Sequence, residues 1–186
     1  MQHPYATEEY TIYQESKQGK PAAQQWLYAE YYPMAAAVCL RYIASVPDAE
    51  EVVADSFIRF FKALSTSFQY QGAGSMKAYL KKITVNQSLM FLRKQRFSFE
   101  EMGEQHEQLA DVNLDALGQL SAKDILKAVQ QLPTGYRTVF NMYVMEGYSH
   151  AEIGEALLVS VATSKTQLMK AKLQLQKILS VYERYL

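Results

Sequence analysis

Apolar residues recur at spacings of three and four along most of the chain, in segments broken by short polar or glycine- and proline-containing stretches. This period is typical of amphipathic helices that bury one face. The segments that carry it, the first of them weakly, are residues 8–17, 22–45, 48–64, 76–96, 121–132, 134–146, 149–157 and 160–186. The pattern predicts an all-α protein with two small helical domains, residues 1–96 and 122–186, joined by a linker over residues 97–121.

The longer segments have apolar rows that are expected to face a core. These rows are Leu27, Tyr31, Met34 and Val38; Val53, Phe57, Phe60 and Leu64; Met76, Leu80, Ile83 and Met90; and Leu168, Ala171, Leu175 and Ile178. Pro33 stands inside the first segment, where a kink or a fresh helix start is expected. Rows of this kind indicate core packing rather than a cofactor site.

Residues suited to helix ends mark several boundaries. Asp48 with Glu51, and Ser149 with Glu152, have the spacing of a capping box, in which two side chains bond reciprocally to the backbone of the first turn. The other expected caps and ends are Ser75, Thr134, Ser160 and Gly147.

The last two segments form a short helix, a break at residues 158–160 and a longer helix. Roughly opposite the apolar row of the longer helix lie Thr163, Thr166, Lys170 and Lys177. This arrangement is typical of a helix-turn-helix whose second helix enters a DNA major groove. A helical hairpin whose polar side only meets solvent has the same pattern, so both interpretations stay open. With the two helical segments before it, this pair makes four helices in the C-terminal domain. The predicted fold of that domain is a four-helix, winged-helix-like helix-turn-helix.

The charge of the chain is unevenly distributed, although its formal total is zero. Residues 1–96 hold eleven Lys/Arg against eight Asp/Glu, and residues 122–186 hold eight against five. Residues 97–121 contain no basic residue and six acids, Glu100, Glu101, Glu104, Glu107, Asp111 and Asp115. Two mildly basic domains could therefore each meet phosphate, with an acidic linker between them.

A cytoplasmic location is expected. The single cysteine, Cys39, lies in an apolar run, which excludes a disulfide framework and favours a small buried hydrophobe. The first twenty residues are polar and do not resemble a signal peptide. The longest apolar run, residues 33–40, is far shorter than the roughly 20 residues needed to cross a bilayer, so no membrane insertion is expected.

A polar, glycine-rich loop at residues 65–75 carries two aromatic residues, Phe68 and Tyr70. These rings could anchor the loop to the core or stack on an unpaired base. The helix that follows has an outward basic face with Lys82, Asn86, Arg93 and Arg96, and Lys77 and Lys81 nearby. A solvated face is one interpretation, and a track for a DNA strand is the other.

Three stretches together resemble an RNA polymerase sigma factor of the extracytoplasmic-function (ECF) group of the sigma-70 family. They are D-A-E-E-V-V-A-D-S-F-I-R-F-F-K at residues 48–62, Y-Q-G-A-G-S-M-K-A-Y-L-K-K-I-T-V-N-Q at residues 70–87 followed by L-R-K at residues 92–94, and residues 132–157 running on through T-S-K-T-Q-L-M-K-A-K. They are similar, in order, to the family's polymerase-clamp helix, its promoter-melting segment and its domain for the minus-thirty-five element.

The resemblance implies a protein without chemistry of its own that binds core RNA polymerase and promoter DNA and helps open the duplex. The residues expected to meet the polymerase clamp are Asp48, Glu51 and Asp55. Those expected at the minus-ten DNA are Phe68, Tyr70, Lys77, Lys81, Lys82, Asn86 and Arg93. Those expected at the minus-thirty-five DNA are Thr163, Lys165, Thr166, Gln167 and Lys170. The acidic linker would thread the active-centre cleft and RNA exit path, and an anti-sigma factor is a further expected partner.

The chain departs from the family pattern at the helix-turn-helix, where Leu158 and Ala162 replace usual glycines. A positive φ at Leu158 would cost on the order of 1 kcal/mol. An enzyme is disfavoured, and no cofactor or metal is expected, because the sequence has neither a Cys/His cluster nor a glycine-rich phosphate loop. Two alternatives remain: a helix-turn-helix regulator with a helical sensing domain, and a degenerate sigma-like module for protein interactions.

Overall fold

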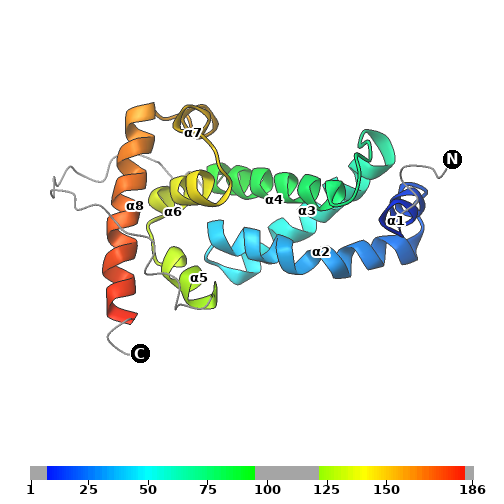
Figure 1. Cartoon of the computed structure of the whole chain (residues 1–186), viewed down its shortest axis with the longest axis horizontal. Coiled ribbons are helices and arrows are strands. Elements are labelled where there is room, and N and C mark those ends of the chain that lie inside the picture. The colour runs from blue at the N-terminus through cyan, green and yellow to red at the C-terminus, as the bar shows by residue number, and fades with distance from the viewer. Residues whose placement is uncertain (1–7, 95–121, 183–186) are drawn as a thin grey trace. The chain divides into compact units, whose positions relative to one another are not determined.

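The computed structural model describes residues 8–94 and 122–182, and the regular structure of these residues is entirely helical, which confirms the all-α prediction (Figure 1). The chain divides into two compact units, with the boundary along the sequence between Leu92 and Arg93. The expected linker, residues 97–121, lies outside the described residues. Among the helices described, none is both long and apolar enough to cross a membrane.

The first unit contains α1 (Glu8–Lys17), α2 (Pro21–Tyr42), α3 (Val46–Thr66) and α4 (Ser75–Lys94). α2 packs along α3, and α1 packs against both. Gly19, with φ 77°, ends the first helix, and Pro21 begins the second, since proline fits the first helical position. α2 continues through Pro33, so no new helix begins there.

The core of the first unit confirms most of the predicted rows. Val53, Phe57, Phe60 and Leu64 of α3 are all buried. In α2 the buried row includes Leu27, Tyr31 and Val38, with Met34 half-buried. Cys39 is buried as well, and this burial raises the pKa of its thiol to about 11, as expected of a small core residue.

The buried face of α4 differs from the predicted one. Met76 and Leu80 are buried, but Ile83 and Met90 are only half-buried. The face turns instead through Thr84, Val85, Ser88, Leu89 and Leu92. The two hydroxyl residues can be buried because each donates to the backbone carbonyl one turn earlier, Thr84 to Leu80 at 2.9 Å and Ser88 to Thr84 at 2.9 Å.

Three of the predicted helix starts are corrected by the structure. Ser45, not Asp48, caps α3, because its Oγ accepts the Asp48 backbone N–H at 3.5 Å; the predicted Asp48–Glu51 box is therefore wrong. Ser75 and Thr134 are first helical residues rather than caps. The hydroxyl of Ser75 instead accepts the N–H of Gln71 at 3.3 Å.

The second unit contains α5 (Ala122–Gln130), α6 (Thr134–Phe140), which passes into the π-helical segment η2 (Asn141–Met145), then α7 (His150–Leu157) and α8 (Val161–Tyr182). α5, α6 and α7 all pack against α8. Leu168, Ala171 and Leu175 of α8 are buried and Ile178 is half-buried, which confirms the apolar row. Gly147, with φ 77°, ends η2 as a left-handed residue, as predicted.

A buried arginine closes the connection between α5 and α6. Arg137 donates from Nη1 to the backbone carbonyls of Gln130 at 2.9 Å and Leu132 at 3.3 Å. Burial lowers the pKa of this guanidinium, yet a group with so high a starting value stays charged at neutral pH. The arginine thus satisfies carbonyls that the end of α5 leaves without helical partners.

Candidate nucleic-acid interface

Each of the two helices α7 and α8 begins with a side-chain cap. Ser149 and Glu152 form the predicted capping box: the Ser149 N–H donates to Glu152 Oε2 at 2.8 Å, and the Glu152 N–H donates to Ser149 Oγ at 3.3 Å. Ser160 caps α8, since its Oγ accepts the Thr163 N–H at 2.9 Å. Both predicted caps are confirmed.

Leu158 occupies the left-handed position at the end of α7, with φ 59° and ψ 40°. It is the one non-glycine residue with positive φ in the part of the chain that the structure describes, and its side chain is 88% exposed. The positive φ whose cost the sequence analysis considered for Leu158 is therefore present. Because glycine accepts this conformation without strain, the leucine makes the turn less stable than the usual residue would.

Gly154 permits the turn to fold back on α7. A Cβ at this position would lie 2.8 Å from the backbone carbonyl oxygen of Val159, closer than real Cβ atoms approach. The sequence analysis did not single out this residue. A glycine inside a short helix, four residues before the expected turn, is the signal that could have identified it.

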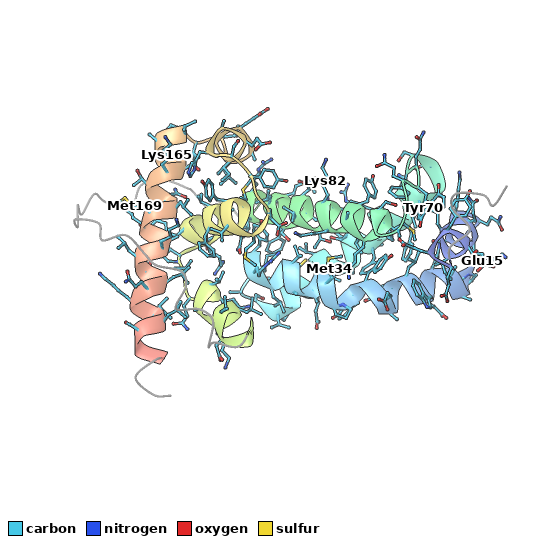
Figure 2. All side chains as sticks on the ribbon, viewed as in Figure 1. Glu15, Met34, Tyr70, Lys82, Lys165 and Met169 are labelled. Atoms are coloured by element: carbon cyan, nitrogen blue, oxygen red, sulfur yellow. The ribbon has the colours of Figure 1, made fainter. Side chains whose placement is uncertain are left out.

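The outer face of α8 presents part of the predicted DNA-contacting set. Lys165 and Thr166 are exposed, and Thr163 and Lys170 are half-buried. Lys165 lies near the end of α8 that follows the turn (Figure 2). The Thr163 hydroxyl is hydrogen-bonded to Ser160 Oγ at 2.8 Å, so its first role is in the cap.

The structure corrects the prediction for Gln167, which is buried. Only 7% of this residue is exposed, and its amide lies against Gly135, where a Cβ would be 3.3 Å from Gln167 Oε1. Ser164, Gln167, Leu168 and Ala171 form one buried stripe at helical spacing, so two polar residues extend the apolar row. The prediction that Gln167 lies on a DNA-facing surface is wrong.

His150 links α7, η2 and α8. Its ring stacks on Tyr143 with centroids 4.5 Å apart, and its Nδ1 lies 2.9 Å from the Ser164 hydroxyl. Partial burial, followed by the charges of Lys165 and Lys172, lowers the pKa of His150. At neutral pH the ring is therefore neutral, and it joins α7 to η2 through the stacking contact and to α8 through the hydrogen bond.

In the first unit, α4 carries a basic row and no acidic residue. Lys77, Lys82, Asn86 and Arg93 are exposed, and Lys81 is half-buried. Lys82 projects outward from the helix (Figure 2). The structure therefore presents the predicted minus-ten cations at the surface, where they could follow a phosphate backbone.

The two loop aromatics are anchored to the fold. Tyr70 stacks on Tyr13 of α1, with centroids 5.5 Å apart and planes 22° apart. Phe68 lies 4.9 Å from the ring of Tyr79 on α4. Both rings are half-buried, so the anchoring interpretation holds in the free protein, and contact with a base stays a prediction.

α3 displays an acidic row on its outer side. Asp48 is half-buried, Glu51 and Asp55 are exposed, and the three recur at spacings of three and four. Ile58 continues this row and is 67% exposed, which sequence reasoning missed. An apolar residue three positions after an acidic one, outside the predicted core row, is the signal that could have found it. Mixed acidic and apolar surfaces of this kind suit a protein partner.

Two family descriptions match the chain in succession: sigma-70 region 2 over residues 27–98 and sigma-70 region 4 over residues 122–175. The chain belongs to the sigma-70 family. In this sigma-70 chain, region 2 covers most of α2 with all of α3 and α4, and region 4 runs from α5 into α8. α1 lies before region 2.

Known relatives are similar along most of this sigma-70 chain. The ECF RNA polymerase sigma factor SigE of Mycolicibacterium smegmatis is 30% identical over 139 residues, which is 72% of this chain and 52% of that protein. The chain therefore spans about half the length of that relative. The sigma factor RpoE of Bartonella quintana, solved in complex with the anti-sigma factor NepR, is 20% identical, with a TM-score of 0.49 over 84% of this chain and 96% of that one.

Within residues 8–94 and 122–182, no three His, Cys, Asp or Glu side chains gather in a group that could hold a metal ion. The described residues form two basic surfaces, on α4 and α8, and one acidic and apolar surface, on α3. They differ in sign and in helix, as binding to nucleic acid and to protein would each require.

Proposed function

We propose that this protein is a transcription initiation factor that binds core bacterial RNA polymerase, directs it to particular promoters and helps open the DNA. The observation that carries this proposal is the succession of sigma-70 regions 2 and 4 in one chain. A ligand-sensing regulator would not need region 2, which contains the acidic row of α3 and the basic row of α4.

Each surface has a role in this proposal. The acidic and apolar row on α3 binds the polymerase clamp, with Ile58 added to Asp48, Glu51 and Asp55. The basic row of α4 follows the non-template strand of the minus-ten region. Lys165 and Thr166, with the half-buried Thr163 and Lys170, face the minus-thirty-five duplex. The factor itself performs no chemistry. Binding of an anti-sigma factor stays a prediction, testable by copurification.

The test is transcription in vitro with core bacterial RNA polymerase on sheared genomic DNA of the source organism, followed by mapping of transcript 5′ ends. The proposal expects reproducible start sites that share upstream elements and that vanish without the chain. If the chain binds those DNA fragments tightly by itself and never associates with core enzyme, it is a regulator and the proposal is wrong.

A charge substitution on α8 tests the minus-thirty-five surface separately. Lys165→Gln should lower the slope of log affinity against log salt by roughly 0.9, because one phosphate contact is lost. The matched control is Lys177→Gln, an exposed lysine on the same helix beyond the end of region 4 at residue 175. Core binding should be unchanged in both. Equal effects of the two substitutions would show that Lys165 contributes only to general charge.

A further inference from the structure

α1 holds the loop between α3 and α4 through a carboxylate. Both oxygens of Glu9 accept the backbone N–H of Gly74, at 3.1 Å and 2.9 Å, across 65 residues of sequence. Figure 1 shows α1 beside the end of the first unit where this loop, residues 67–74, connects α3 to α4. The loop is thus tied to a helix that precedes region 2.

Gly74 lies where the loop ends and α4 begins, so a hydrogen bond to its N–H acts on both. Its φ is 82°, and its carbonyl accepts the Ala78 N–H at 3.0 Å as the first turn of α4 begins. Glycine offers no side chain to cap that helix, and Glu9 brings a negative charge to its N-terminal end from another part of the chain. Fixing Gly74 therefore fixes both the end of the loop and the start of the basic helix.

Aromatic contacts from α1 hold the rest of the loop. The Tyr13 hydroxyl donates to the carbonyl of Phe68 at 3.1 Å, and its ring stacks on Tyr70. Tyr10 lies 5.3 Å from the same Tyr70 ring, which Figure 2 labels near α1. Two successive turns of α1 thus touch the loop at three of its residues.

Glu9 is itself held in place from α2. The Tyr31 hydroxyl donates to Glu9 Oε1 at 3.5 Å. Burial first, and then the neighbouring Glu9 carboxylate, raise the pKa of Tyr31, so the phenol keeps the proton that it donates. The Glu9 carboxylate therefore bridges α2 and the start of α4.

We propose that Glu9 is a positioning residue for DNA opening: it fixes the α3–α4 loop before DNA arrives, so that an unpaired promoter base meets a preformed loop. This inference rests on the proposed function. A loop that is ordered in the free protein loses less conformational entropy on binding than one that must be ordered by its ligand. The device lies in α1, outside the residues matched by region 2.

The first test measures the loop in the free full-length protein by amide hydrogen exchange. Glu9→Ala should raise the exchange rate of the amides of residues 69–74 about tenfold, since a hydrogen bond to a charged group is lost. Glu9→Gln should give an intermediate rate, because its amide oxygen still accepts from Gly74. Glu8→Ala, at an exposed neighbour on the same helix, is the matched control and should leave the rate unchanged. Unaltered exchange in Glu9→Ala would overturn the inference.

The second test uses the chain with core polymerase and a promoter recovered by the 5′-end mapping described above. The probe is a fork template whose minus-ten non-template strand is unpaired. Glu9→Ala should bind this template about tenfold more weakly in the holoenzyme, with Glu9→Gln intermediate and affinity for core enzyme unchanged. An abasic site at the base that enters the loop should abolish the difference between Glu9→Ala and the unsubstituted protein.

The outcomes separate the two proposals. If the unsubstituted chain supports no promoter-specific initiation, the proposed function is wrong, and the inference about DNA opening fails with it. If the unsubstituted chain initiates transcription and Glu9→Ala binds each template as tightly as the unsubstituted protein does, the inference alone is wrong. A parallel loss of core affinity in Glu9→Ala would show a general structural defect and would likewise overturn it.

Discussion

Replacing Leu158 by glycine should stabilise the second unit, although the substitution removes a large side chain. Leu158 is left-handed, with φ 59° and ψ 40°, and is 88% exposed. The residue therefore carries backbone strain while its side chain makes few contacts. Most substitutions from a large apolar residue to glycine destabilise a protein, so a gain in stability here would be a specific sign of the strain.

The expected magnitude follows from three contributions. Relief of left-handed strain adds about 1–2 kcal/mol. The greater freedom of glycine in the unfolded chain removes roughly 0.5–1 kcal/mol. A fully buried leucine contributes about 1.5–3 kcal/mol, so the small buried part of Leu158 accounts for only ~0.2–0.4 kcal/mol. The net gain for Leu158→Gly is then about 0.5 kcal/mol, whereas Leu158→Ala, which keeps the strain, should lose about 0.3 kcal/mol.

The assay is urea unfolding of the full chain, in which hydrogen exchange of peptides from residues 141–175 monitors the unfolding. Following those peptides separates the second unit from the first, because a chain of two units need not unfold in one step. The decisive quantity is the difference between the glycine and alanine variants, about 0.8 kcal/mol in favour of glycine. Equal stability of the two variants would refute the strain argument.

Three further predictions concern the same unit and the same measurement. Gly154→Ala should lower the free energy of unfolding by roughly 1–3 kcal/mol, because its Cβ would collide with the Val159 carbonyl oxygen. Arg137→Ala should lower it by about 2–4 kcal/mol, since buried carbonyls lose their donor and a cavity remains. Hydrogen bonds from the Ser149 backbone and then its side chain lower the pKa of Glu152, so ionised Glu152 stabilises α7 above the ordinary carboxyl pKa of about 4.3. That contribution should disappear as the pH falls through the folded value.

Each of these has a matched comparison. Ala162→Gly, at an exposed position in the first turn of α8, shows what a small substitution near the turn does without a collision. Arg137→Lys keeps the charge but cannot reach two carbonyls in a fixed fork, so it should recover only part of the loss. Glu152→Gln should remove the acid-dependent difference, and a pH dependence unchanged from that of the unsubstituted protein would contradict the assignment to Glu152.

The spacing of the large apolar residues predicted the helices and most of their inward faces. The prediction of the inward face was wrong where polar residues are buried. Thr84 and Ser88 of α4 point inward because their hydroxyls bond to their own helix. Gln167 points inward because α6 leaves room beside Gly135. Neither condition is visible in local spacing, which is why Gln167 was assigned to the DNA-facing surface.

Contacts between distant segments were the other feature that the sequence could not predict. The weak helical pattern of residues 8–17 predicted α1 correctly, but its bonds to Phe68 and Gly74 join residues 55 and 65 positions apart. The predicted caps at Ser149 and Ser160 are confirmed, whereas those at Asp48, Ser75 and Thr134 are wrong. At α3, Asp48 and Glu51 fitted a capping box, yet Pro47 is suited to the first turn, and the helix therefore begins after Ser45.

The zero net charge of the chain is consistent with the proposed function because charge acts through separate surfaces. The acids of α3 recur along one row that contains the exposed Ile58, as a surface for a protein partner would. The cations of α4 lie on a helix without any acid, where they are not neutralised by neighbours on the same helix. With a Debye length of about 8 Å at physiological salt, each surface acts on what it touches and not through the total. Reversing the charge of Asp55 should therefore weaken core binding while leaving the affinity of α8 for duplex DNA unchanged, and a change in both would show that the surfaces are not independent.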